Sequence, residues 1–139
     1  MRIMAIDYGD AHTGIAISDP TGFLAGFTTV ITAYRPETVA QQVAALAKEH
    51  GAEELVLGHP KNMDGTRGPR AEKAEAMAEL LKEATGLPVV LWDERRTTID
   101  AHQILMSGGK NAKKRKKVVD AVAASLILEG YLTYKKSHP

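Results

Sequence analysis

The first 32 residues contain three apolar segments that are joined by connections too short to hold a helix. The segments are residues 2–8, 13–19 and 23–32, and glycine-containing turns separate them. Because parallel neighbours need a crossover of a dozen or more residues, these strands can pair only as antiparallel neighbours. The first third of the chain therefore predicts an antiparallel meander.

After residue 35 the apolar pattern changes to helices that alternate with single strands. A proline near each start, apolar residues at helical spacing and a glycine at each end predict helices at 36–51 and 69–86. Further segments are predicted as strands at 54–57 and 88–92, a third helix from Thr97 or Thr98 to Gly108-Gly109, and a last helix from about Lys116 to Tyr134. The order βββαβαβαα predicts an α/β fold, a mixed sheet flanked by helices, in a single domain over residues 1–139.

Composition excludes several classes of protein. With 44% hydrophobic and 25% charged residues, a chain of 139 residues can bury a core, so a disordered chain is excluded. The absence of cysteine excludes disulfides, thiolate catalysis and cysteine zinc sites, and the five histidines lack zinc-ligand spacing. Since neither a signal peptide nor a membrane span is apparent, we expect a cytoplasmic protein.

The net charge of +1 hides a concentrated basic segment. Six cations lie within eight residues: Lys110, Lys113, Lys114, Arg115, Lys116 and Lys117. Without them, 12 basic and 17 acidic residues remain, a net charge of −5. Such a block is either the solvated start of a helix or a binding site for a polyanion, with nucleic acid as the expected partner. Arg95 and Arg96 would extend that surface, and because the block contains no aromatic residue, base stacking on it is not expected.

Asp7 ends the first predicted strand and begins the pattern Asp7-x-Gly9-x-x-x-x-Gly14. Strand alternation places Asp7 on the same face as Ile3 and Ala5. The residue either shapes the turn or belongs to a metal or phosphate site, since the glycines let the backbone approach an anion.

Two histidines are weaker candidates for phosphate contacts. His12 and His59 both lie in glycine-containing loops at strand ends. Surface or turn roles are the alternative for both, and Gly9 is the accompanying candidate for a backbone contact with phosphate.

Two further carboxylates are candidates for chemistry. Asp120 lies in a segment that is apolar nearly all round, where an ionised group is costly unless it is paired or bound to metal. A lysine from residues 113–117 or an exposed helix face could also satisfy it. Asp93 and Glu94 follow the fifth predicted strand, where open α/β sheets bind ligands, although either could simply favour a helix start.

Three carboxylates from the first strand, the loop after the fifth strand and the last helix would repel one another without a cation. Hard divalent ions such as Mg²⁺ prefer oxygen ligands of this kind. Two such ions can activate a water and stabilise the leaving oxygen of a phosphodiester. The spacing alone does not show that the carboxylates meet.

Four stretches of the sequence resemble one known family. They are MAIDYGDAHTGIAISD, LVLGHPKNMDGTRGPRA, LWDERRTT and KKRKKVVDAVAASLIL, and in this order they resemble the RuvX (YqgF) family over nearly the whole chain. The family belongs to the RNase H-like superfamily and is related to RuvC-type Holliday junction resolvases. The resemblance implies a five-stranded mixed sheet in the order 3-2-1-4-5. It also implies a metal site for one or two Mg²⁺ or Mn²⁺ ions at Asp7, Glu94 and Asp120.

The resemblance also indicates an activity. Family members are described as endonucleases that trim the 5′ end of precursor 16S rRNA, and in older descriptions as Holliday junction resolvases. This chain departs from the family at His12, where arginine is usual, and at His59, where leucine is usual. Neither change removes a carboxylate, but both could alter how the substrate is held.

We therefore expect a metal-dependent endonuclease of structured RNA, acting in ribosome biogenesis, as a monomer or homodimer. Cleavage of a four-way DNA junction is the same chemistry on another substrate, and it would require a dimer with two opposed sites. A nucleic-acid-binding factor without catalysis is a second alternative. A sugar-kinase or actin-like phosphotransferase shares the Asp-x-Gly pattern but needs two such domains.

Overall fold

A computed structural model describes residues 1–19, 25–60, 68–93 and 112–137. Its elements, in chain order, are β1 (Ile3–Asp7), β2 (His12–Ser18), β3 (Ala25–Thr32), α1 (Pro36–His50), β4 (Glu54–His59), α2 (Pro69–Thr85), β5 (Val89–Asp93) and α4 (Ala112–Ser137). The helix predicted between Thr97 and Gly109 lies outside the described residues. Every other predicted element is present, with bounds that differ by a few residues.

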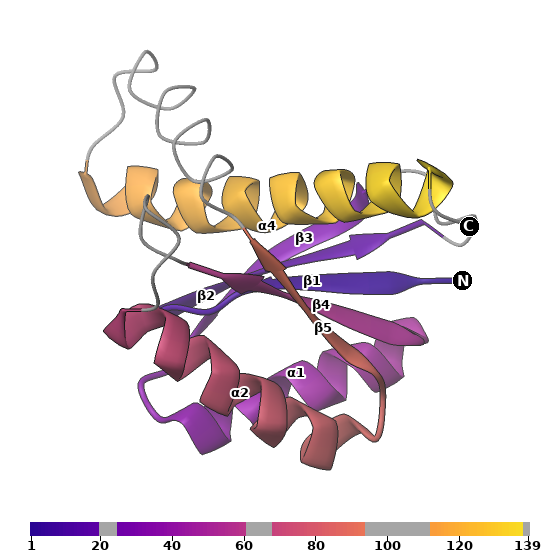
Figure 1. The fold of residues 1–139 in the computed structure, drawn as a ribbon. Helices are drawn as coiled ribbons and strands as arrows, with labels where there is room; N and C mark the ends of the chain where they lie inside the picture. Colours follow the sequence, from indigo (N-terminus) through magenta and orange to yellow (C-terminus); the bar gives the residue numbers. More distant parts are fainter. Residues whose placement is uncertain (20–24, 61–67, 94–111, 138–139) are drawn as a thin grey trace.

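The five strands form one sheet in the order β3-β2-β1-β4-β5 (Figure 1). β2 pairs antiparallel with both β1 and β3, whereas β4 pairs parallel with β1 and β5. This confirms both the antiparallel meander and the predicted order 3-2-1-4-5. Helices α1 and α2 cover one face of the sheet and α4 covers the other (Figure 1).

A separate hydrophobic cluster fills each side of the sheet, and β1 contributes to both. Met4 and Ile6 pack with α1 and α2, whereas Ile3 and Ala5 pack with α4. All four side chains are at most 2% exposed, so β1 is fully buried along this stretch. Alternation then places Asp7, the next residue in the series of Ile3 and Ala5, on the α4 side of the sheet.

Helices α1 and α2 begin and end as the sequence predicts. Each has a proline in its first turn, and each is followed by a glycine in the left-handed conformation, Gly51 at φ 70° and Gly86 at φ 69°. A residue with a Cβ would be strained at these two angles.

Helix α4 begins at Ala112, four residues earlier than predicted. Alanine, lysine and arginine are strong helix formers, and this propensity extends the helix through most of the basic segment. None of the helices in the described ranges combines the length and the apolar run that a membrane crossing requires.

Helix α4 runs antiparallel to the central parallel strands. Near its end, the Tyr131 hydroxyl donates a hydrogen bond of 2.9 Å to Oε1 of Glu54, the first residue of β4. The carboxyl-terminal half of α4 therefore lies over the starts of the parallel strands, and its first turns lie towards their ends. Figure 1 shows the starts of α2 and α4 at the same end of the molecule.

Candidate functional site

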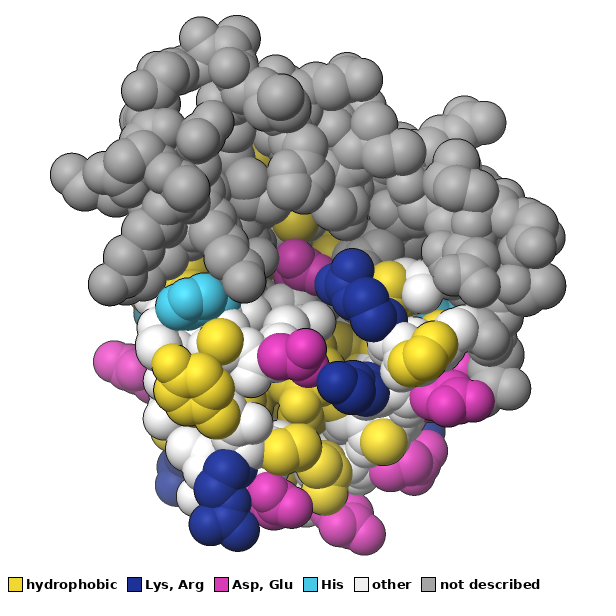
Figure 2. All heavy atoms as spheres, turned by 90° about the vertical axis from the view of Figure 1, so that its left-hand side faces the viewer, with side chains coloured by type: hydrophobic (Ala, Val, Ile, Leu, Met, Phe, Trp, Pro, Cys, Tyr) yellow, Lys and Arg dark blue, Asp and Glu magenta, His cyan; other side chains and the backbone are white. Residues whose placement is uncertain are grey.

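The candidate site lies where the parallel strands end. At this edge β1 ends at Asp7, β4 at His59 and β5 at Asp93, and the antiparallel strand β2 begins at His12. We call this the carboxyl edge, and the opposite end, where β1 and β4 begin, the amino edge. Figure 2 looks onto the carboxyl edge and shows acidic and basic side chains near one another, with a histidine and hydrophobic side chains around them.

Asp7 occupies the end of a central strand. It pairs with Gly14 of β2, and its side chain is half-buried, in contrast to the fully buried Ala5 and Ile6 before it. Asp7 therefore combines contact with solvent and a rigid backbone, which suits a carboxylate that binds an ion at the surface of a cleft.

Residue 120 belongs to the first half of α4, and buried residues of the same helix follow it. Ala123 and Ala124, three and four residues later, are fully buried, and Ala124 and Ile127 pack with Ala5 of β1. Residues three, four and seven apart share one face of a helix. Asp7 and position 120 are thus on the same side of the sheet, near the carboxyl edge, which the sequence spacing could not establish.

The structure also distinguishes between the two carboxylates after β5. Asp93 pairs with His59 across the parallel strands, on the side of the sheet that carries α1 and α2. Val90 and Trp92 pack on the opposite side, with α4. The sheet therefore separates Asp93 from Asp7. Glu94 lies outside the described residues, so its place in the site stays a prediction.

His59 is held by a partner that the sequence analysis missed. Its ring is 11% exposed, and its Nε2 lies 2.7 Å from Oε2 of Glu75 on α2. The bond ties the end of β4 to α2. A buried histidine at a strand end requires a polar partner, but the sequence could not show that Glu75, 16 residues away, supplies it. The phosphate contact predicted for His59 stays a prediction.

The turn between β1 and β2 explains the glycine at position 9. A Cβ at Gly9 would collide with the carbonyl oxygen of His12, so only glycine fits. The backbone N–H of Gly9 also donates to Oγ1 of Thr13 at 3.5 Å. The turn alone thus accounts for this glycine, while a phosphate contact at Gly9 stays a prediction. His12 is half-exposed, and its Nδ1 lies 3.3 Å from Oγ1 of Thr32 on β3.

Charges at the carboxyl edge are mixed and exposed. Nζ of Lys73 lies 3.0 Å from Oδ1 of Asp10, and the two side chains are 57% and 83% exposed. Burial raises the pKa of the neighbouring Tyr8 hydroxyl, and the negative charge of Asp10 raises this pKa further. An exposed pair of this kind adds little stability.

The first turns of α4 bring part of the basic segment to the same edge. Residues 113–117 lie in α4, which begins towards the ends of the parallel strands. Lys110, Arg95 and Arg96 lie outside the described residues. The placement of this stretch next to the carboxyl edge is the arrangement that a nucleic-acid site requires.

Comparison with known proteins identifies the family. The RuvX family, described as "Holliday junction resolvase", matches residues 1–134. A relative from Halothermothrix orenii is 45% identical over 135 residues, which cover 97% of this chain and 96% of the relative. The chain belongs to the RuvX family. A second RuvX relative, from Carboxydothermus hydrogenoformans, is 41% identical over 138 residues, 99% of this chain and 100% of the relative, and both are named "Putative pre-16S rRNA nuclease".

Structural comparison agrees with the RuvX assignment. RuvC from Thermus thermophilus superposes with a TM-score of 0.62 at 13% sequence identity, covering 99% of this chain and 97% of RuvC. At this identity the likeness shows the fold, which is RNase H-like, as the resemblance predicts. Membership of the RuvX family makes the chain a nuclease.

A divalent metal ion is the group that the three predicted carboxylates would hold. Asp7 offers a hard oxygen ligand at the end of a strand, and residue 120 belongs to α4. Within residues whose placement is described, no three His, Asp or Glu side chains form a metal-binding group. The side chains of Asp120 and Glu94 are not among those residues, so the ligand set of all three stays a prediction.

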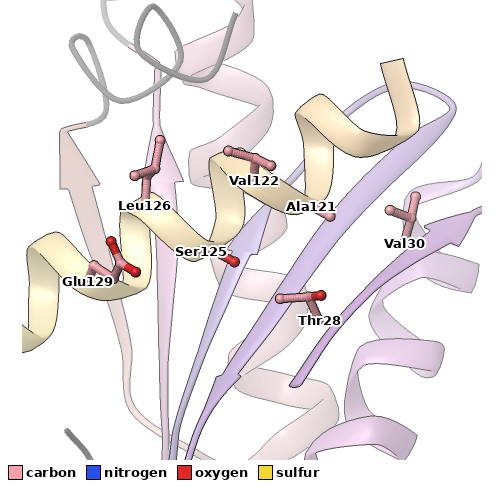
Figure 3. Close-up of a pocket in the computed structure, with 7 residues that line it drawn as sticks. All are labelled: Thr28, Val30, Ala121, Val122, Ser125, Leu126 and Glu129. Carbon is pink, nitrogen blue, oxygen red and sulfur yellow. The ribbon is translucent and has the colours of Figure 1, made fainter. Parts of the chain in front are cut away.

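A groove of about 520 Å³ lies next to the candidate site, between α4 and β3 (Figure 3). It is lined by Thr28, Val30, Ala121, Val122, Ser125, Leu126 and Glu129. The lining is mainly apolar and includes one carboxylate and no lysine or arginine. Such a lining does not favour binding of a phosphate backbone, so the groove is not expected to contact nucleic acid.

Proposed function

We propose that the chain is a divalent-metal-dependent endonuclease that hydrolyses phosphodiester bonds of structured nucleic acid, with the 5′ end of precursor 16S rRNA as its substrate. The observation that carries the proposal is the position of Asp7 and of residue 120 on one side of the sheet. Carboxylates at these two positions could share a cation, and the RuvX family is one of nucleases.

Asp7, Glu94 and Asp120 would hold one or two Mg²⁺ or Mn²⁺ ions. When bound, such ions activate a water for attack on phosphorus and stabilise the leaving oxygen. The carboxylates would hold the ions in a fixed position, because β1 and α4 are packed against each other through fully buried side chains. Lys113, Lys114, Arg115, Lys116 and Lys117, at the start of α4, would bind the phosphates on either side, and Lys110, Arg95 and Arg96 would extend this surface.

The substrate proposal rests on the relatives. Proteins that are 41–45% identical over at least 95% of this chain carry the name pre-16S rRNA nuclease. The structure of Thermus thermophilus RuvC in complex with a Holliday junction concerns a protein only 15% identical, so it supports the fold and not the substrate. RNA is therefore the first choice, and a four-way junction is the alternative that the family description favours.

A cleavage assay tests the proposal. Two substrates would be incubated with Mg²⁺, with Mn²⁺ and with a chelator: an RNA with the 5′-extended 16S end and a synthetic four-way DNA junction. Wild type would be compared with Asp120→Asn and with Glu129→Gln, a control at an exposed position of the same helix.

We expect metal-dependent cleavage of the RNA by wild type and Glu129→Gln, and none by Asp120→Asn. Cleavage of the junction alone would replace rRNA by branched DNA as the substrate. If neither substrate is cut while wild type and Asp120→Asn bind both equally, the proposal is wrong and a binding factor takes its place.

A further inference from the structure

The side chain of Tyr34 is unusually exposed to solvent. Its side chain is 77% exposed, the largest value among the large hydrophobic residues that the structure describes. The residue before it, Ala33, is 7% exposed, and its N–H donates to the carbonyl oxygen of Ala11 at 3.0 Å. The ring is therefore attached to a fixed piece of backbone, and its exposure does not come from a loose chain.

The position of Tyr34 is at the carboxyl edge. It follows β3, whose last residue, Thr32, pairs with His12, the first residue of β2. Asp7 pairs with Gly14 of the same β2 strand. Since β3 is two strands away from β1, a lateral distance of about 10 Å separates the strand that leads to Tyr34 from the strand of Asp7.

Basic groups accompany the ring. Arg35, the next residue, is exposed, and its side chain makes no capping hydrogen bond to α1. His12 is half-exposed on the neighbouring strand. An exposed ring that is followed in the chain by an exposed arginine offers the two groups that bind a single-stranded nucleic acid, a ring on which a base stacks and a cation for a phosphate.

The other exposed tyrosine, Tyr134, also precedes a basic residue, but its ring is partly covered and it lies at the amino edge. Tyr134 is 47% exposed, but its ring lies 5.6 Å from Trp92 and 6.5 Å from Tyr131, so neighbouring rings already cover part of it. It also follows Tyr131 in the part of α4 that lies over the starts of the parallel strands.

We propose that Tyr34 is a stacking platform for an unpaired base of the substrate, with Arg35 binding an adjacent phosphate. This inference rests on the proposed function, and it specifies which kind of nucleic acid binds. The nucleic acid bound at the carboxyl edge would have a single-stranded segment next to its duplex, as a 5′ extension does.

Binding of two RNA hairpins in the presence of a chelator tests the inference. Both hairpins would have the same stem, and one would carry a single-stranded 5′ extension. Fluorescence anisotropy would compare wild type with Tyr34→Ala, with Tyr34→Phe and with the matched control Tyr134→Ala. Thermal unfolding of each variant would verify that it is folded.

We expect Tyr34→Ala to weaken binding of the extended hairpin about 10-fold, the usual contribution of one stacked base. Tyr34→Phe keeps the ring and should bind the extended hairpin as wild type does, and so should Tyr134→Ala. All variants should bind the blunt hairpin with equal affinity. Equal affinity of Tyr34→Ala and wild type for the extended hairpin would overturn the inference, as would equal weakening for both hairpins.

The cleavage assay separates the two proposals. If wild type cuts RNA and Asp120→Asn does not, while Tyr34→Ala binds normally, only the stacking inference fails. If wild type neither binds nor cuts any RNA, both fail.

Discussion

The amino edge and the carboxyl edge of the sheet are formed by the same strands but differ in how their polar groups are used. At the amino edge, the Tyr131 hydroxyl and Nζ of Lys135 both donate to Oε1 of Glu54, at 2.9 and 3.0 Å. A guanidinium N–H of Arg2 donates to the carbonyl oxygen of His50 at 2.7 Å. These hydrogen bonds connect α4 and α1 to the starts of the strands.

At the carboxyl edge, in contrast, several polar and aromatic groups face the solvent, although His59 is largely buried and bonded to Glu75. Asp7 is half-buried at the end of a buried strand, Tyr34 is 77% exposed, and the Asp10–Lys73 pair is largely in water. An exposed ion pair such as Asp10–Lys73 contributes little to folding. The comparison indicates that the amino edge stabilises the fold and that the carboxyl edge is available for substrate, as ligand sites of open α/β sheets are.

Asp7→Asn should show the largest effect, and it should affect activity alone. If Asp7 holds the metal as proposed, loss of its carboxylate removes several kcal/mol of transition-state stabilisation, so RNA cleavage should fall about 10³-fold or more. The free energy of unfolding should change much less than the barrier to cleavage, because Asp7 lies at the end of its strand and is partly accessible to solvent. Single-turnover cleavage and urea unfolding measure the two quantities. A large loss of stability with unchanged cleavage per folded molecule would break the comparison.

Tyr131→Ala should show the opposite behaviour at the amino edge. Tyr131 is 5% exposed and packs against Trp92 at 5.7 Å, so its truncation should cost about 3 kcal/mol of unfolding free energy. Cleavage per folded molecule should stay within about threefold of wild type. Urea unfolding gives the first value, and the RNA assay at a temperature well below the transition gives the second. A large loss of cleavage per folded molecule would mean that the amino edge contributes to catalysis, which would contradict the comparison of the two edges.

Tyr131→Phe should show a smaller effect that depends on pH. Burial and the hydrogen bond to Glu54 raise the pKa of Tyr131 to about 12, from an unfolded value of 10.0. The unfolded chain therefore loses this proton first, and the stabilisation, which is fully present below pH 10, is lost as pH rises towards 12.

At pH 7 the Phe variant should be about 1 kcal/mol less stable than wild type, because the hydrogen bond to Glu54 is gone. Above pH 10 this difference should shrink, by at most about 1.4 kcal/mol per pH unit. Urea unfolding from pH 8 to 11 measures it, with Tyr134→Phe as the control. If the stability difference between wild type and Tyr131→Phe stays constant over this pH range, the pKa of Tyr131 is not raised as described.

Much of the fold could be predicted because its determinants are local. Short connections dictate the meander, and prolines and glycines dictate the ends of α1 and α2. Strand alternation also predicted correctly that Ile3 and Ala5 share one face, since both pack with α4. The start of α4 was predicted too late because the basic stretch looked like a connection, although its residues favour a helix.

The candidate site could be predicted only in part, because its geometry depends on contacts between distant segments. The separation of Asp93 from Asp7 follows from the register of β5 on β4, which no local pattern encodes. The same holds for the Tyr131–Glu54 bond, which joins residues 77 apart. Tyr34 lies in a connection, where a sequence carries no signal of how exposed a ring will be.

Binding of Mn²⁺ tests most directly the central claim that Asp7 and Asp120 share a metal at the carboxyl edge. Calorimetric titration would compare wild type, Asp7→Asn, Asp120→Asn and the double variant, in the absence of nucleic acid. If both carboxylates hold the same ion, each single variant should lose at least about tenfold in affinity. The double variant should then lose less than the sum of the two free-energy changes. Unchanged affinity in either single variant, or strictly additive losses, would contradict the account.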